Sequence, residues 1–205
     1  MFKYILAFTT VVLISCLVIG CVHLLRVSQK NKKELSKYEN KEIEYTNNLG
    51  NTLVVYYSLS GNTKQIADNI ADKTDAAMFE IKTTAEIEQG PKFYLDIKKQ
   101  LKSKKYPSIE EKMPDFQEYD TIFVGFPVWW YTIATPVLAF LQTADFNGKK
   151  VVPFSTQGSN YGTSFTDFEQ MAKNAKIAKG NSFNNVDKKY DKAVDNKITD
   201  WLNNL

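Results

Sequence analysis

Beyond residue 51, strand-like and helix-like segments alternate regularly along the chain. Runs rich in β-branched and aromatic residues are predicted to form strands at 52–57, 77–81, 119–125, 151–155 and 176–183. Apolar residues recur with helical spacing at 63–74, 91–105, 136–142, 164–172 and 187–205. Strands that alternate with helices form a mostly parallel sheet with helices on both faces. The sequence therefore predicts an α/β domain with a doubly wound five-stranded sheet.

The chain contains one histidine and two cysteines, and all three precede Arg26, at Cys16, Cys21 and His23. A body without imidazole or thiol holds no Ser-His-Asp triad, Cys-His pair, Cys/His zinc site, iron–sulfur cluster or internal disulfide. Any chemistry in that body rests on carboxylates, lysine, tyrosine, backbone amides or a bound cofactor.

Composition divides the chain into an apolar leader (1–26), a polar and charged spacer (27–50) that we expect to be helical in part, and a body (51–205) of ordinary domain size. The net charge of +3 comes from the first 50 residues, because the acidic and basic side chains of the body balance. A neutral body lacks the basic surface of nucleic-acid-binding proteins, so we expect no nucleic-acid partner.

The leader is uncharged between Lys3 and Arg26. As a helix, this stretch is long enough to span a bilayer, whereas the apolar region of a cleaved signal peptide has about 7–15 residues. It predicts an N-terminal transmembrane anchor in contact with membrane lipid. The alternative is a bacterial lipoprotein signal, in which Cys21 or Cys16 carries the lipid. The lysines after Arg26 favour a cytoplasmic body, whereas a lipidated cysteine places the body outside the cell.

Ligands of doubly wound sheets bind outside the carboxyl ends of the strands, and three connections of unusual composition lie there. The first combines three hydroxyls, an amide and a glycine with a helix N-terminus; its residues are Ser58, Leu59, Ser60, Gly61, Asn62 and Thr63. Helix N-termini bind phosphate through their free N–H groups. Because the loop contains no lysine, it suits a phosphate monoester held by neutral donors. An ordinary helix cap is the alternative.

The second connection, 125–132, places bulky rings in a loop and so predicts a flat apolar ligand that stacks on them. A corner packed under the next helix, or a protein-contact patch, is the alternative. Because Trp129 and Trp130 are neighbours, we expect one to face the core and only the other to face the ligand. The third connection, 156–163, offers two glycines and hydrogen-bonding Gln, Asn and Tyr side chains, a pattern also typical of plain flexible loops.

A phosphate site, an aromatic wall and a polar rim together fit flavin mononucleotide (FMN). The sequence resembles the flavodoxin-like family, specifically its oxidoreductases with a Phe-Pro-hydrophobic-Trp-Trp loop. Residues 58–63 resemble the family's Thr-x-Thr-Gly-Asn-Thr phosphate loop, with serine replacing threonine twice. Residues 125–130 and 156–159 resemble its two isoalloxazine loops. The resemblance covers 52–205 and implies a flavodoxin-like sheet of strand order 2-1-3-4-5 with non-covalent FMN.

The resemblance also implies which residues contact the cofactor. The phosphate contacts are Ser58, Ser60, Gly61, Asn62 and Thr63, and the flavin contacts are Pro127, Val128, Trp129, Trp130, Tyr131, Thr156, Gln157, Gly158, Ser159, Tyr161 and Gly162. The position of Gln157 more commonly holds a small residue in this group. The flavin carries the chemistry, so no catalytic side chain is required, and Tyr131 and Tyr161 are the nearby candidates for proton donation.

These observations predict an FMN-binding redox protein tethered to a membrane. Its partners would be a redox donor such as NAD(P)H or a reductase, and a small-molecule or protein acceptor. Electron-carrying flavodoxins are typically strongly acidic, whereas this body is neutral. The alternative is an interaction module that keeps the flavodoxin fold without redox activity, and substitution of Gly61 and Thr63 separates the two functions.

Overall fold

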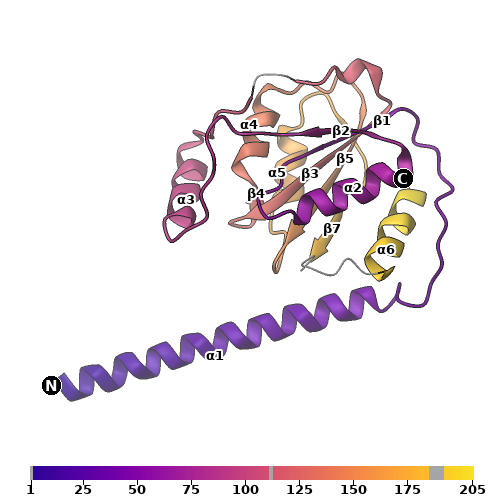
Figure 1. Ribbon diagram of the computed structural model, residues 1–205. Helices are drawn as coiled ribbons and strands as arrows, with labels where there is room; N and C mark the ends of the chain where they lie inside the picture. The colour runs from indigo at the N-terminus through magenta and orange to yellow at the C-terminus, as the bar shows by residue number, and fades with distance from the viewer. Residues whose placement is uncertain (1, 111–112, 185–191) are drawn as a thin grey trace.

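The computed structural model describes residues 2–110, 113–184 and 192–205. A long N-terminal helix, α1 (Phe2–Leu35), extends away from an α/β body (Figure 1). The strands of the body are β1 (Thr52–Tyr56), β2 (Ala77–Glu80), β3 (Thr121–Trp129), β4 (Thr132–Ile133), β5 (Lys150–Gln157), β6 (Lys176–Ile177) and β7 (Asn181–Asn184). Its helices are α2 (Asn62–Thr74), α3 (Phe93–Ser103), α4 (Thr135–Thr143), α5 (Ser164–Met171) and α6 (Lys192–Asn203), with a 3₁₀ turn at Phe116–Glu118.

The sheet has the order β2-β1-β3-β5-β6, and all of these neighbours are parallel. In terms of the five predicted strands this is the order 2-1-3-4-5, which is confirmed. The predicted fifth strand is divided in two, because β6 pairs with the start of β5 and β7 pairs with its end. The short strand β4 pairs antiparallel with β3 and forms a hairpin that the sequence analysis did not predict.

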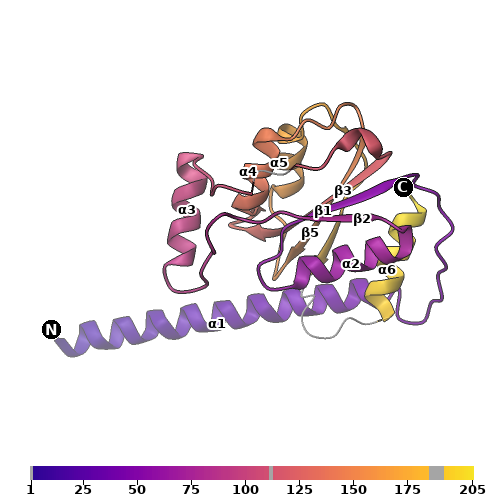
Figure 2. The same cartoon turned by 45° about the horizontal axis from the view of Figure 1, so that its top comes forward.

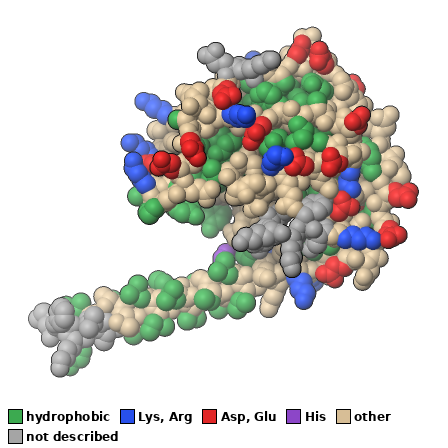
Figure 3. Space-filling view, viewed as in Figure 1, with side chains coloured by type: hydrophobic (Ala, Val, Ile, Leu, Met, Phe, Trp, Pro, Cys, Tyr) green, Lys and Arg blue, Asp and Glu red, His purple; other side chains and the backbone are tan. Residues whose placement is uncertain are grey.

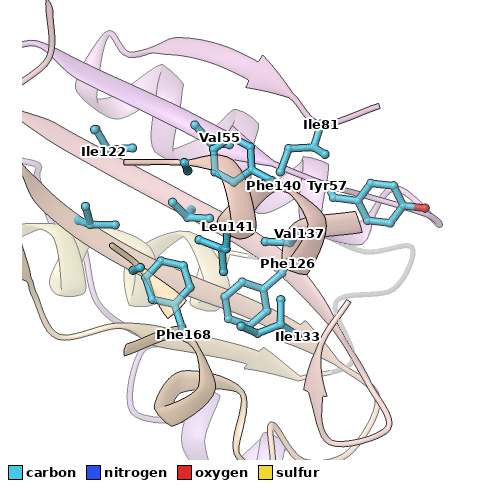
Figure 4. Packing of buried hydrophobic residues seen from close by; sticks show 14 of the residues in the cluster. Val55, Tyr57, Ile81, Ile122, Phe126, Ile133, Val137, Phe140, Leu141 and Phe168 are labelled. Carbon is cyan, nitrogen blue, oxygen red and sulfur yellow. The ribbon is translucent and has the colours of Figure 1, made fainter. Parts of the chain in front are cut away.

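Helices cover both faces of the sheet, as Figure 2 shows. Side chains alternate along each strand, so Leu53 and Val55 of β1 pack in one core and Val54 packs in the other. The first core lies against α4 and α5 and is rich in fully buried phenylalanines (Figure 4). The second core lies against α2 and α6. This two-sided burial explains why the central strands read as nearly continuous apolar runs.

The second connection differs from its prediction, because residues 126–129 continue strand β3 instead of forming a loop. Backbone pairing with β5 extends as far as Pro127, which lies opposite Thr156. Proline is tolerated here because β1 has already ended: its pairing with β3 stops at Tyr56 and Gly125. The strand therefore carries the aromatic residues beyond the edge of the main sheet.

Two predicted helix boundaries also shift. Helix α3 begins at Phe93 and not at Pro91, because the Phe93 N–H bonds to the Gly90 carbonyl in a preceding turn. The closing helix α6 begins at Lys192, and the predicted helical residues 187–191 lie outside the described residues.

The spacer packs along α6 through two asparagines. The Nδ2 group of Asn196, which is 2% exposed, donates to the carbonyls of Tyr38 (3.0 Å) and Lys41 (2.8 Å). The Nδ2 group of Asn203 donates to the carbonyl of Glu44 at 2.8 Å. These bonds satisfy spacer backbone groups that have no strand or helix partner. Residues 38–46 therefore follow a defined path over the body.

Helix α1 itself contacts α6 through an ion pair whose lysine is buried. The Lys197 ammonium lies 2.6 Å from Glu34 Oε1 and donates to the Ser182 carbonyl at 2.6 Å. Burial lowers the pKa of Lys197, and the hydrogen bond to Glu34 opposes that shift. The C-terminal end of α1 is thus fixed to the body.

Candidate functional site

A cavity of about 420 Å³ lies at the carboxyl ends of the central strands, where all three connections meet. Its lining comes from the first connection, the β3–β4 hairpin, the end of β5 and the start of α3: Leu59, Ser60, Asn62, Gln89, Phe93, Tyr94, Pro127, Val128, Trp129, Trp130, Thr156, Gln157 and Gly158. The size is within the range of ordinary small-molecule sites.

The N-terminus of α2 is open toward solvent. Its N-cap residue is Gly61, which has a φ of 90°. Because glycine has no side chain, no side-chain hydrogen bond caps the helix. The neighbouring Ser58 hydroxyl is buried and has no hydrogen-bond partner in the described parts of the chain. The nearest lysine in sequence, Lys64, pairs with Asp68 at 2.7 Å. The groups left for a ligand are therefore neutral N–H and O–H donors at the positive end of a helix dipole.

Buried polar bonds tie the first and third connections together. The hydroxyls of Thr63 and Thr156 lie 2.7 Å apart, and both residues are buried. On either side of Thr156, the Ser155 hydroxyl donates to Gln157 Oε1 at 3.0 Å. That bond orients the amide, whose buried Nε2 has no partner among the described residues. Because Gln157 lines the cavity, it offers a fixed donor to a ligand.

The second connection is a two-residue hairpin turn. Trp130 and Tyr131 link β3 to β4, and both have positive φ, 50° and 64°. This is the pattern of a type I′ turn, which normally uses Asn and Gly. Each L-residue in such a left-handed conformation costs roughly 1–2 kcal/mol. The Thr163 N–H holds the turn by bonding to the Tyr131 carbonyl at 2.8 Å.

The hairpin and α3 build an aromatic wall. The Trp129 ring meets Tyr57 and Phe93 edge to face, with centroids 5.7 and 5.1 Å apart. The Trp130 indole N–H donates to the Tyr94 carbonyl at 2.9 Å, and its ring lies under the Lys98 ammonium at 5.0 Å. Trp129 packs against the first core, as expected of one of the two indoles. Both indoles nevertheless line the cavity, contrary to the expectation that only one would, because Trp129 is only partly buried there.

The cavity collects nine of the sixteen residues that the sequence analysis assigned to the cofactor: Ser60, Asn62, Pro127, Val128, Trp129, Trp130, Thr156, Gln157 and Gly158. Ser58, Gly61 and Thr63 lie in the same first connection but do not line it, and neither do Tyr131, Ser159, Tyr161 and Gly162. Tyr131 and Tyr161 are exposed, at 57% and 45%.

Four lining residues were not predicted: Leu59, Gln89, Phe93 and Tyr94. Leu59 was read only as part of the phosphate loop. The other three lie at the start of α3 and in the segment just before it, which follows β2 in the sequence and belongs to none of the three connections. The aromatic pair at the start of that helix was the signal available for them.

Comparison with known proteins follows this geometry. A sequence model described as flavodoxin matches residues 51–205. The chain belongs to the flavodoxin family. The matched region includes β1, all three connections and α6. No curated protein matches the chain.

Solved structures of flavodoxin-like proteins have the same fold. A flavoprotein from Lactobacillus acidophilus, in complex with FMN, is 28% identical with a TM-score of 0.59, covering 65% of this chain and 93% of its own. A Bacteroides uniformis protein classed as a flavoprotein is 27% identical with a TM-score of 0.62, covering 75% of this chain and 97% of its own. The parallel α/β sheet is thus that of flavodoxin-like proteins.

Proposed function

We propose that the protein is an FMN-binding redox protein tethered to a membrane by α1. One observation carries this proposal: a helix N-terminus, an aromatic wall and a fixed amide donor meet at the same cavity. The FMN complex of the similar Lactobacillus acidophilus flavoprotein supports the choice of ligand.

The residues present fit FMN at both of its ends. The uncapped start of α2 and the unpartnered Ser58 hydroxyl are suited to a phosphate. The indoles of Trp129 and Trp130 are suited to a flat ring system, and the Nε2 group of Gln157 to an acceptor atom on that ring. Buried polar atoms without partners are costly, so a ligand that bonds to them offsets that cost.

Bound FMN supplies hydride and single-electron transfer, chemistry that protein side chains do not provide. The chain contributes binding and orientation. Ser155 orients Gln157, Thr63 holds Thr156, and Tyr57 with Phe93 holds Trp129 in place. The described cavity lining contains no carboxylate or ammonium group, so the ring would lie among neutral donors and aromatic rings.

We infer that α1 places this site at a membrane. Its stretch Phe8–Leu35 has a mean hydropathy of 2.4 in its most apolar part, and that part is fully exposed. Exposed apolar surface of this extent is characteristic of a membrane span or a targeting signal. The docked spacer and the Lys197–Glu34 ion pair would keep the body close to the anchor.

We expect FMN and the protein to occur together in the membrane fraction. Cells that express the full chain should yield membranes from which detergent extracts a yellow protein, and denaturation of that protein should release FMN. A carbonate wash, which strips peripheral proteins, should leave both in the pellet. A colourless protein that takes up no added FMN would instead favour an interaction module, and release by carbonate would contradict the anchor.

The strained hairpin gives a matched pair of variants. Tyr131→Gly relieves a left-handed residue outside the cavity, so it should raise the free energy of unfolding by about 1 kcal/mol and change FMN affinity less than about threefold. Trp130→Gly relieves similar strain but removes an indole from the cavity wall, so it should weaken FMN binding by about tenfold. Urea unfolding and fluorescence titration with FMN measure the two effects. Equal FMN affinities in the two variants would contradict the role of Trp130.

A further inference from the structure

A second groove adjoins the proposed FMN cavity. It has a volume of about 540 Å³ and lies over the carboxyl ends of β1 and β2. The two share Leu59 and Gln89 in their linings, so they are neighbours separated by these side chains. The first core borders the groove on its inner side through Ile81.

The groove is acidic at its rim and apolar at its floor. Its lining contains a single lysine, Lys82, against four glutamates: Glu80, Glu86, Glu88 and Glu110. The half-buried Leu59 and Ile87 supply apolar surface. Figure 3 shows acidic side chains around an apolar area over the end of β2. None of the six ion pairs found in the described parts of the chain uses one of these glutamates, so their charge is directed to solvent.

One phenol with a buried ring faces the same groove. Tyr57 is 7% exposed and lines the groove, and its hydroxyl has no hydrogen-bond partner in the described residues. In Figure 4 the Tyr57 ring lies at the edge of the apolar cluster, and its hydroxyl points away from that cluster. Burial, with the charge of Glu80, raises the pKa of Tyr57 to about 12. The phenol is therefore a neutral hydrogen-bond donor at physiological pH.

We propose that this acidic groove binds a small organic cation that carries a carbonyl or similar acceptor oxygen on an apolar body. The Tyr57 hydroxyl would donate to the oxygen, the floor would cover the apolar part, and the glutamate rim would attract the positive charge. A carbonyl on the ligand can accept a hydrogen bond from this hydroxyl, which is open to the groove. The same rim repels anions, so nucleotide phosphates are poor ligands for this groove.

The position of the groove relates it to the flavin cavity. The Tyr57 ring contacts Trp129 edge to face at 5.7 Å, and Trp129 lines the FMN cavity. A cation bonded to Tyr57 would thus lie one aromatic side chain away from that cavity. The groove itself is formed by protein groups alone, so its ligand binding stands apart from the FMN proposal.

A charged probe and its neutral isostere test the proposal. The probe is phenacyltrimethylammonium, an aromatic ketone with a quaternary ammonium, and the isostere is 3,3-dimethyl-1-phenylbutan-1-one, which has carbon in place of nitrogen. Calorimetric titration of the detergent-solubilised full chain, with and without added FMN, should give at least about tenfold tighter binding of the cation. Equal binding of the two compounds would overturn the proposal.

Three variants locate the binding. Tyr57→Phe keeps the ring contact with Trp129 but loses the hydroxyl donor, so it should weaken the binding of both probes by about three- to tenfold. The double variant Glu86→Gln/Glu88→Gln should weaken the binding of the cationic probe by about tenfold and leave the binding of the neutral probe unchanged. The double variant Glu118→Gln/Glu169→Gln makes the same change in net charge away from the groove and should leave the binding of both probes unchanged.

Two outcomes would contradict the assigned site. One is a loss of cation binding in Glu118→Gln/Glu169→Gln, and the other is an unchanged affinity for both probes in Tyr57→Phe. Cation binding in a protein that takes up no FMN would refute the proposed function and leave this site intact.

Discussion

Replacing Ser60 with aspartate is expected to weaken FMN binding by about a hundredfold or more. Ser60 lines the cavity in the connection that leads to the α2 N-terminus, where the phosphate is proposed to bind. A carboxylate about 4 Å from a phosphate charge costs about 4 kcal/mol at an effective dielectric constant of 20, and each 1.4 kcal/mol is a factor of ten. Exposure to solvent reduces this electrostatic cost. A reduced cost of about 3 kcal/mol still corresponds to a hundredfold loss of FMN affinity.

Ser60→Asn is the matched control, because asparagine has the shape of aspartate without its charge. Its FMN affinity should stay within about fivefold of the native protein, and both variants should fold, because Asp and Asn are tolerated in loops that precede a helix. Fluorescence titration of the FMN-free protein measures the affinities, and raised salt should narrow the gap between the variants. If Ser60→Asp and Ser60→Asn weakened FMN binding equally, the phosphate would not lie near Ser60.

Much of the candidate site could be predicted from sequence because it lies in connections whose composition departs from ordinary loops. Residues 58–63 follow a buried strand and precede an amphipathic helix, and parallel strands bring such connections to one edge. The alternation of strand-like and helix-like segments predicted a mostly parallel sheet, and the family resemblance implied its strand order; the sheet confirms both.

Contacts between distant segments could not be predicted in this way. Phe93 and Tyr94 reach the cavity because α3 packs beside α4, and nothing in the local sequence specifies that placement. The connection 125–132 was predicted as a loop, yet pairing with β5 as far as Pro127, and with β4 beyond it, keeps residues 126–129 in a strand. Tertiary pairing overrode the local signal there. The acidic groove was missed for the same reason, since its glutamates come from separate segments.

Glycines show how local sequence and packing give different information. Gly61 is required by conformation: its φ is 90°, and a Cβ there would meet nothing within 4 Å. Gly125 is required by space: it lies within β3, and an added Cβ would lie 2.5 Å from Cε2 and 2.7 Å from Cε1 of Phe154. Gly125 was predicted to lie where the strand 119–125 meets the connection 125–132, and nothing in the local sequence showed that Phe154 packs against it.

Gly125→Ala should therefore lower the free energy of unfolding by about 3 kcal/mol, at the upper end of the usual cost of overpacking a core. Phe154 is fully buried on the neighbouring strand β5, and Gly125 pairs directly with it. Neither strand can move apart without losing the parallel pairing that holds the central sheet. Urea unfolding followed by tryptophan fluorescence measures the loss, and a change below about 0.5 kcal/mol would contradict the close packing of these two residues.

A second substitution separates this clash from a general weakness of the strand. Phe154→Leu alone should cost about 1–2 kcal/mol, because it removes part of a buried ring. In the double variant Gly125→Ala/Phe154→Leu the new methyl occupies space that the ring has vacated. Its destabilisation should therefore be smaller than the sum of the two single effects, by about 1–3 kcal/mol. Purely additive effects would mean that Gly125→Ala acts through strand propensity and not through Phe154.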